Sequence, residues 1–449
     1  MKRNFFTVLF LLVGTVAIKA QDMNLDECIR YALKNNLSYA NKNIESSISN
    51  EQYHQSKRDF LPSLTAGSSA NKRYGRSIDP TTNTFVNQDF FSMNFYLDSQ
   101  VDLFRGFTRL NTVKFQKLQY LISRENIKQK EMEIAFAVMN KYYDVLYFRG
   151  LQSIVQEQVK LTTLNLEKTQ KLIELGLKAE SDLLEMKAQE ASEMHNLVLA
   201  QNQHDMAMLT LKNLMNYPAT EELRIQNETM SATTEELILA ETVYTVALQH
   251  MPSVQRANFD VEAAQKKLHI ARGHLAPRLT LGAGIFTNYA DSRKERLFPD
   301  DPANTATRTI PFNDQWSQNM SKSIFLNLQI PIFNKWNGMS EVKQARLNRL
   351  MAQNRQKEEQ QNLFQLINED IQQLKSLYNE RNLLQAKKNA LQESYTIAEK
   401  KLEQGLINVI EFYTAKNQFA QAEADWTRTL LQIKVKEKTI DFYLGKKIY

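Results

Sequence analysis

The sequence contains few of the residues that interrupt helices. Only 12 glycines and 9 prolines occur in 449 residues, whereas average usage predicts about 31 and about 22. Turns are therefore few, and the elements between them must be long. From Arg109 to Leu175 there is no proline and the only glycine is Gly150, and the segment from Met339 to Gln404 has neither. If these segments are helical, each is about 100 Å long.

Residues that carry catalysis or bind metals are scarce as well. The single cysteine, Cys28, excludes a disulfide within the chain. The histidines are scattered, and no two have the spacing of a zinc site on one helix. The sequence has no glycine-rich phosphate loop and no serine-hydrolase or zinc-protease motif. It therefore predicts a protein that is not an enzyme and has no cofactor or metal site.

The first twenty residues have the pattern of a secretory signal peptide. Lys2 and Arg3 precede an apolar segment over residues 5–17, and we expect cleavage after Ala20. The apolar segment is short for a membrane anchor, which needs about 20 residues. Removal of residues 1–20 lowers the formal net charge from +6 to +3. No concentrated basic face remains, so we expect no nucleic-acid partner.

The chain repeats itself with a long period. Many positions between Leu97 and Asn216 have a similar residue 229 positions later, whereas upstream the offset is 215. The second copy therefore carries 14 extra residues, between Leu279 and Leu326. Solenoid repeats are much shorter, so each copy must contain several elements. We expect a first repeat over 21–216, a linker over 217–235, a second repeat over 236–445 and a tail over 446–449.

The long helical segments are predicted to form hairpins with coiled-coil packing. Apolar residues recur every seven positions at Leu377, Leu384, Leu391 and Ala398, and again at Phe412, Phe419, Trp426, Ile433 and Ile440. This spacing keeps one side facing a partner helix. Gly176-Leu177 and Gly405-Leu406 interrupt the two long helices, because glycine adopts the left-handed conformation that ends a helix. We interpret the charged residues on the other faces, including Lys388, as a solvated surface. Shorter helices are expected over 25–34, 39–57, 235–249 and 253–272.

Between the helices the hydrophobic period changes to two, which predicts strands. Apolar residues alternate with polar ones at Phe91, Met93, Phe95, Leu97, Val101 and Leu103, and at Ile324, Leu326, Leu328, Ile330 and Ile332. We expect four strands, near 61–74, 90–104, 278–290 and 321–333. Their length and alternation are typical of strands that cross a bilayer. A soluble sheet covered on one face fits the alternation as well, but the signal peptide and the hairpins favour the membrane.

On that interpretation one parity of each strand faces lipid. The predicted lipid-facing residues are Phe91, Met93, Phe95, Leu97, Val101, Ile324, Leu326, Leu328 and Ile330. Candidates for the membrane interfaces are Tyr74, Phe90, Phe91, Phe286, Tyr289 and Phe325. Open sheet edges are not tolerated in lipid, and the smallest common barrels need about eight strands. Several copies of the chain must therefore share one barrel.

In this order the features resemble the TolC-like outer-membrane efflux family. They are the duplication, Leu61-Pro62 and Ala276-Pro277 at the helix-to-strand junctions, Tyr142-Tyr143 in the long helix, and the two Gly-Leu tips. The resemblance implies a mostly α fold with a small β part, made of helical hairpins and four membrane strands per chain. It also implies a homotrimer with a shared twelve-stranded barrel in outer-membrane lipid and an α-helical tunnel in the periplasm.

The resemblance also implies partners and site residues. The partners are a periplasmic adaptor and, through it, an inner-membrane transporter. Gly176, Leu177, Gly405 and Leu406 mark the tips that resemble the adaptor contact. Asp182 and Glu411 are the candidate residues of the periplasmic tunnel mouth: Glu411 matches a position in an acidic ring there, and Asp182 matches an acidic partner in the network that latches the tips. For Asp182 an ordinary acidic residue near a helix N-terminus fits equally well, with a contribution of about 0.3–1 kcal/mol.

The chain departs from the family pattern at the tips. The residues that correspond to the tyrosine and the arginine of the family's polar latch are Leu402 and Ile407, and a second acidic position corresponds to Thr414. We therefore expect closure of the mouth to depend more on apolar packing.

The predicted function is a passive exit duct for small molecules, such as drugs and toxic compounds, or for secreted products. The alternative is a secreted or periplasmic coiled-coil or adaptor protein without a barrel, which would not need four alternating strands.

Overall fold

The computed structural model describes residues 22–78, 83–87, 89–227, 239–300 and 303–447. The predicted signal peptide over 1–20 and part of the predicted linker lie outside the described residues. Two compact units divide the chain: one comprises Met1–Asn43, Asn126–Val254 and Gln360–Tyr449, and the other Ile44–Glu125 and Gln255–Glu359. The long helices α3 (Thr108–Glu174) and α8 (Asn337–Glu403) contribute residues to both units.

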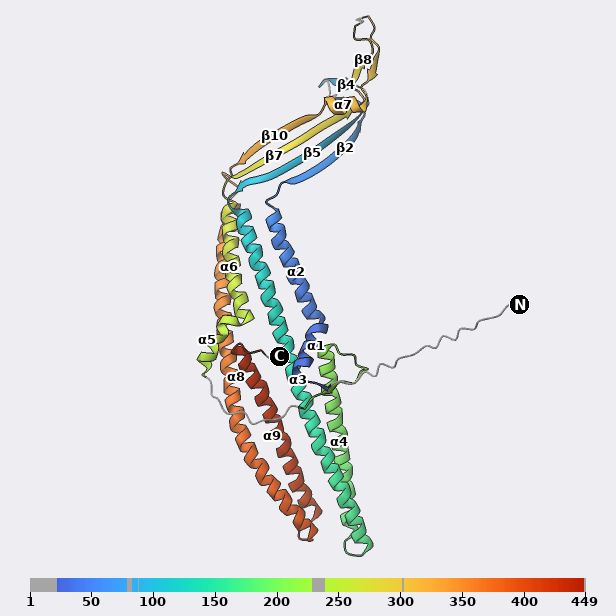
Figure 1. The fold of residues 1–449 in the computed structure, drawn as a ribbon, viewed down its shortest axis with the longest axis vertical. Coiled ribbons are helices and arrows are strands. Elements are labelled where there is room, and N and C mark those ends of the chain that lie inside the picture. Colours follow the sequence, from blue (N-terminus) through green and yellow to red (C-terminus); the bar gives the residue numbers. More distant parts are fainter. Residues whose placement is uncertain (1–21, 79–82, 88, 228–238, 301–302, 448–449) are drawn as a thin grey trace, which may run out of the picture. The chain divides into compact units, whose positions relative to one another are not determined.

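The first unit is helical and contains two antiparallel hairpins. Within it, α3 turns into α4 (Glu180–Met215), and α8 turns into α9 (Val409–Tyr443) (Figure 1). Both breaks lie at the predicted glycines, so the hairpin prediction is confirmed. The shorter helices α1 (Leu25–Asn35) and α5 (Ala240–His250) belong to the same unit. The predicted helix over 235–249 begins only at Ala240 in the described part of the chain.

The helix α1 is fixed by its cap and by its buried face. Asn24 accepts a hydrogen bond from Glu27 N at 2.9 Å, and Glu27 returns one to Asn24 N at 2.9 Å, which is a capping box. Cys28 and Ile29 are fully buried against α3 residues that include Tyr142. Burial raises the pKa of the Cys28 thiol to about 12, so this cysteine is a core residue and not a reactive thiol. The short parallel strands β1 (Asp22–Met23) and β6 (Arg224–Ile225) pair beside it.

The seven-residue pattern of α9 packs as predicted. Phe412, Ile433 and Ile440 are buried, and the ring of Phe419 stacks on Tyr395 of α8 with centroids 5.8 Å apart. The interpretation of Lys388 as a solvated residue is wrong. Its side chain is 17% exposed, pairs with Glu423 at 3.3 Å and lies 4.4 Å from the Trp426 ring centroid. A lysine stem covers apolar surface readily, and the aromatic ring attracts its ammonium group.

The second unit holds a four-stranded antiparallel sheet, as predicted. Its strands are β2 (Ser63–Arg73), β5 (Phe90–Arg105), β7 (Arg278–Ala290) and β10 (Ser321–Gln329), in the order β10-β7-β5-β2 (Figure 1). Helix α2 (Leu37–Arg58) leads into β2, and α6 (Pro252–Gly273) leads into β7. The far end of the sheet is the end opposite these helix junctions.

A β-bulge corrects one predicted strand position. The register between β5 and β7 shifts between Asp102 and Phe104, so that Phe104 lies opposite Leu279. Leu103 therefore leaves the apolar alternation, and Phe104 takes its place. A bulge inserts one extra residue and reverses the alternation beyond it.

Several short elements at the far end of the sheet were not predicted. They are β3 (Arg76–Ile78) with β4 (Phe85–Asn87), β8 (Lys294–Arg296) with β9 (Thr307–Thr309), and helix α7 (Phe312–Gln318). The segment with the extra residues of the second copy thus forms a hairpin and a helix. Elements this short have too few residues for a hydrophobic period to identify them.

In the part of the chain that the structure describes, no helix combines the length and apolarity that a membrane crossing requires.

Candidate functional site

The tip of the first hairpin ends α3 with a Schellman motif. Gly176 has φ +68°, and its N–H donates to Ile173 O at 2.8 Å. Leu177 N donates to Leu172 O at 2.8 Å. These two bonds satisfy carbonyl groups at the helix end that the helix itself leaves free.

The second tip repeats this geometry at the equivalent positions. Gly405 has φ +70° and donates to Leu402 O at 3.1 Å, and Leu406 N donates to Lys401 O at 2.9 Å. A Cβ atom added at Gly405 or Gly176 would meet no atom within 4 Å. The requirement for glycine is therefore the positive φ alone, which other residues adopt at a cost of roughly 1–2 kcal/mol.

Each tip leaves one large apolar side chain in the open. The residue after the tip glycine in a Schellman motif usually packs back onto the helix. Here Leu177 is 70% exposed and Leu406 is 67% exposed. Both side chains are thus available to a partner, and the rest of each tip fixes their position.

The two predicted mouth carboxylates lie at the starts of α4 and α9. Glu411 accepts a bond from the Asn408 side-chain amide at 3.1 Å, while Asn408 Oδ1 accepts from Glu411 N at 2.8 Å. Asp182 is half-buried and lies 4.0 Å from Lys178, and its helix has Ala179 at the N-cap without a side-chain bond. Each acid is thus held within its own tip, with Glu411 exposed and placed by the stronger cap.

Leu402 and Ile407, which replace the latch residues, pack against apolar neighbours. Both are half-buried against a cluster that includes Phe412 and Tyr413. The predicted apolar character of this region therefore agrees with the contacts within one chain.

A buried polar cluster joins the two hairpins. Lys416 of α9 is 3% exposed and Glu193 of α4 is 2% exposed, and Lys416 Nζ lies 2.9 Å from Glu193 Oε1. Nζ also donates to Thr162 Oγ1 at 2.7 Å and to Gln158 O at 2.8 Å, both on α3. Thr162 in turn donates to Glu193 Oε2 at 2.5 Å. The ammonium group therefore has partners on both helices of the other hairpin.

Burial lowers the pKa of Lys416, and the hydrogen bond and charge of Glu193 oppose this shift. Sequence reasoning missed the cluster, although one pattern identifies it. Lys416 follows Phe412 by four positions and precedes Phe419 by three, so it lies on the apolar side of α9.

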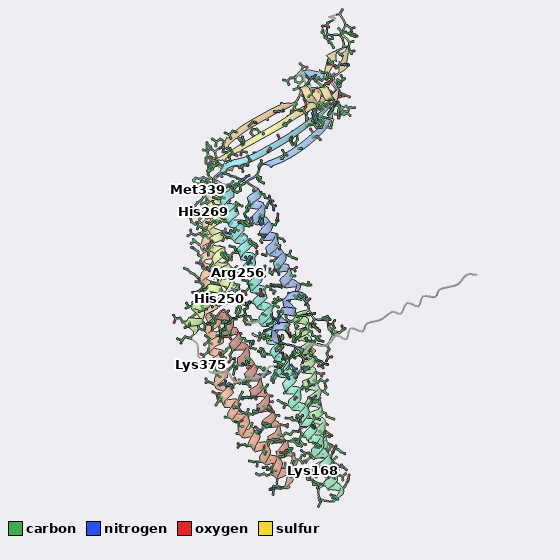
Figure 2. The ribbon with its side chains drawn as sticks, viewed as in Figure 1. Lys168, His250, Arg256, His269, Met339 and Lys375 are labelled. Carbon is green, nitrogen blue, oxygen red and sulfur yellow. The ribbon has the colours of Figure 1, made fainter. Side chains whose placement is uncertain are left out.

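A second ion pair between the hairpins is exposed. Lys168 of α3 lies near the free end of its hairpin (Figure 2), and its Nζ is 3.1 Å from Glu403 Oε1 of α8. The two side chains are 56% and 60% exposed. Exposed pairs contribute at most about 1 kcal/mol, because water screens both charges. Lys168–Glu403 is therefore the natural control for the buried pair.

Strand register places the predicted lipid-facing residues on one face of the sheet. The pairs Leu97–Ile285, Val101–Leu281 and Leu281–Leu326 lie directly opposite each other, and opposite residues share a face. This apolar face contains Phe91, Met93, Phe95, Leu97 and Val101 of β5, and Ile324, Leu326 and Leu328 of β10. Ile330 lies one residue beyond the end of β10.

The opposite face carries polar side chains and two aromatic–glycine contacts. A Cβ atom at Gly67 would lie 2.3 Å from the Tyr96 ring, and one at Gly282 would lie 2.2 Å from the Phe325 ring. The two contacts are equivalent in the two repeats. Phe325 therefore lies across the sheet from the apolar face, and so does Phe286, which pairs with Tyr96. The two residues therefore do not share the face of the predicted lipid-facing residues.

Comparisons with known proteins agree with this architecture. A profile of the outer membrane efflux protein family matches residues 28–217 and again 243–446. A search of curated proteins finds no match.

Solved structures with the same fold include the Campylobacter jejuni outer membrane channel CmeC, with a TM-score of 0.77, 15% identity and coverage of 94% of this chain and 86% of that chain. The Vibrio cholerae outer membrane protein VceC has a TM-score of 0.76 and 15% identity, with coverage of 95% and 97%. The open-state Neisseria gonorrhoeae channel MtrE has a TM-score of 0.72 and 16% identity, with coverage of 94% and 88%.

We predict that Lys416→Met weakens the junction between the hairpins. It leaves the Glu193 carboxylate buried without its cation, which costs about 3–5 kcal/mol. Hydrogen exchange of α4 and α9 amides should accelerate accordingly. The double variant Lys416→Met, Glu193→Met should recover much of the protection, because no unpaired charge remains.

The matched control is Lys168→Met, which removes the exposed pair. It should change the free energy of opening that hydrogen exchange measures by at most about 1 kcal/mol. Equal effects of Lys416→Met and Lys168→Met would contradict a special role for the buried cluster.

Proposed function

We propose, because the chain belongs to the outer membrane efflux protein family, that three copies of it form the exit duct of a tripartite export system. The family consists of non-enzymatic outer-membrane channels whose helical part is periplasmic, and its members function as trimers in tripartite systems. The exported material is small molecules, such as drugs and toxic compounds, or secreted products. The inner-membrane transporter supplies the energy, since the duct has no chemistry of its own.

The two open edges of the sheet carry the proposal of a shared barrel. Among the described residues, β10 and β2 each have a strand neighbour on one side only. Each backbone N–H or C=O group that has no hydrogen-bond partner in hydrocarbon costs several kcal/mol, as any buried polar group without a partner does. Each strand is antiparallel to its neighbour, so β10 and β2 run in opposite directions. Pairing β10 of one chain with β2 of the next therefore continues the antiparallel pattern, and three chains close the barrel.

The mass of the purified particle in detergent tests this proposal. We expect three chains and a requirement for detergent during extraction. A monomer that is extracted without detergent would instead support a secreted coiled-coil or adaptor protein.

The exposed tip leucines support docking of a periplasmic adaptor. We predict that Leu406→Glu together with Leu177→Glu abolishes adaptor capture, because charged side chains replace the apolar contacts while the tip glycines remain. The readout is adaptor pull-down alongside the trimer mass. The control is Leu406→Met with Leu177→Met, which keeps the apolar contact. Normal capture by the glutamate variants would argue against docking at the tips.

The acid at the start of α9 supports a cation-attracting mouth. If Glu411 faces the axis of the trimer, three carboxylates meet there, and like charges attract cations and resist full ionisation. We predict that Glu411→Gln weakens cation selectivity and block by multivalent cations, and that Glu411→Lys reverses the selectivity. Single-channel recording in a planar bilayer measures both.

Glu411 also takes part in the α9 cap, so loss of the cap has to be separated from loss of the charge. Asn408→Ala removes the capping side chain, at a cost of about 1 kcal/mol, and should leave the selectivity intact. Unchanged selectivity in Glu411→Lys would place the residue away from the pore.

The apolar face of the sheet supports contact with lipid. We predict that Leu97→Arg impairs assembly, since an arginine facing lipid costs roughly 2–4 kcal/mol at the midplane. Asp98→Arg should be tolerated, because the next residue faces the opposite side. The measurement is the fraction of heat-resistant trimer in the outer membrane. Equal assembly of both variants would remove the proposed orientation of the sheet.

A further inference from the structure

Helix α7 closes part of a strand edge that β10 leaves open. The pairing of β10 with β7 ends at Ser321, which lies opposite Phe286. Residues 287–290 of β7 therefore extend beyond β10 and do not pair with it. Gln315 of α7 is fully buried; it accepts from Ala290 N at 3.0 Å and donates to Ala290 O at 2.9 Å. Asn319 donates to Asn288 O at 2.7 Å. Side chains of this segment thus satisfy the backbone where the sheet loses a strand.

The aromatic side chains of α7 lie over the apolar face of the sheet. The ring of Trp316 is 4.9 Å from Phe95, and the ring of Phe312 is 5.5 Å from Tyr289. Phe95 and Tyr289 share the face of Leu97 by strand register. Phe312 remains 41% exposed and Trp316 37% exposed. The apolar surface of the sheet therefore continues onto α7.

If the apolar face contacts lipid as proposed, this position corresponds to one boundary of the membrane band. The apolar parity of β7 runs from Leu279 to Tyr289, about 34 Å along the strand, which a tilt of about 40° reduces to the roughly 25 Å height of a barrel's apolar band. Because α7 contacts residues 287–290, it lies at the far end of that band. Tryptophan and tyrosine concentrate at such boundaries, because their rings are apolar and their N–H or O–H groups find polar partners.

A lysine on the same face supplies a charge at this boundary. Lys322 pairs with Ile285, which pairs with Leu97, so Lys322 lies on the apolar face. It is level with Leu97, two residues nearer the middle of the sheet than Phe95. Its side chain is exposed. A lysine in this position extends its stem over apolar surface and brings its ammonium group to the boundary. The complementary group there is the phosphate of a lipid headgroup.

We propose that α7, through Trp316 and Phe312, is an in-plane anchor in the headgroup region of the outer leaflet, and that Lys322 binds a lipid phosphate beside it. The far end of the sheet lies opposite the junctions with the periplasmic helices, which assigns the anchor to the outer leaflet. A second copy of the chain pairs along the strand edges and leaves the outer face to lipid. The inference rests on the proposed contact of the apolar face with lipid.

Tryptophan quenching in vesicles tests the anchor. The chain has 3 tryptophans, so Trp336→Phe with Trp426→Phe leaves Trp316 alone in the full-length trimer. In vesicles of phosphatidylethanolamine and phosphatidylglycerol, lipid brominated near the headgroup should quench Trp316 strongly, and aqueous iodide only weakly. A trimer that keeps only Trp426, which lies half-buried on α9, should show no quenching by the brominated lipid. Strong quenching of Trp316 by iodide would overturn the proposal. Absence of quenching by both agents would also overturn it, and would indicate that another copy covers Trp316.

A further reporter separates this inference from the proposed function. Leu326→Trp, in a trimer without the other tryptophans, should be quenched by lipid brominated deep in the chain. Quenching at Leu326→Trp without quenching at Trp316 refutes the anchor alone. Quenching at neither position refutes both the anchor and the proposed contact of the apolar face with lipid.

The charge of Lys322 has its own test. Lys322→Gln should lower retention of phosphatidylglycerol in native mass spectra about fivefold, and Lys322→Arg should preserve it. Equal retention in all three proteins would refute phosphate binding.

Discussion

Unpaired backbone groups at the edges of the four-stranded sheet are the constraint on which the rest of this chain depends. A sheet with β10 and β2 as open edges is stable in water but not in hydrocarbon, where every N–H and C=O group needs a partner. In the proposed barrel another copy satisfies the long edges, which makes the oligomer part of the fold. The short stretch of β7 beyond β10 is satisfied within the chain, by Gln315 of α7 and by Asn319, the residue that caps its C-terminus. Pairing with another copy and capping by the α7 segment both supply hydrogen-bond partners to backbone groups at an open strand edge.

The two repeats share several features at equivalent residues and differ in others. Both tips use the same Schellman bonds, and both hairpins of the sheet cover a glycine with an aromatic ring. The cap is present at Asn408 and absent at Ala179. Lys416 is buried with Glu193, whereas its repeat equivalent Lys187 is exposed. The one buried ion pair described between the hairpins uses only one of these two lysines.

The buried pair has a cost as well as a function. Removing two charges from water is unfavourable, and such pairs are often no more stable than apolar replacements. Their value lies in geometry, because Lys416 has partners on α3 and α4 at once. An apolar contact between the hairpins tolerates sliding, whereas the ammonium group loses its bonds if either helix shifts. The cluster therefore fixes the relative register of α9 and the first hairpin near the tips, where Leu402 and Ile407 supply only apolar packing.

Local chemistry determined most of the fold. The scarcity of glycine and proline predicted the long helices, the tip glycines predicted their ends, and the period of two predicted the strands and the face of Leu97 and Leu326. These features depend on backbone conformation and on neighbours a few residues away, which a sequence displays directly. The bulge at Leu103, the packing of Lys388 and the contacts of α7 with β7 were decided only by tertiary structure. Each depends on a partner from a distant segment, as Lys416 depends on Glu193, 223 positions earlier in the chain; a periodic pattern records that a side chain is buried or exposed, but not which distant group it meets.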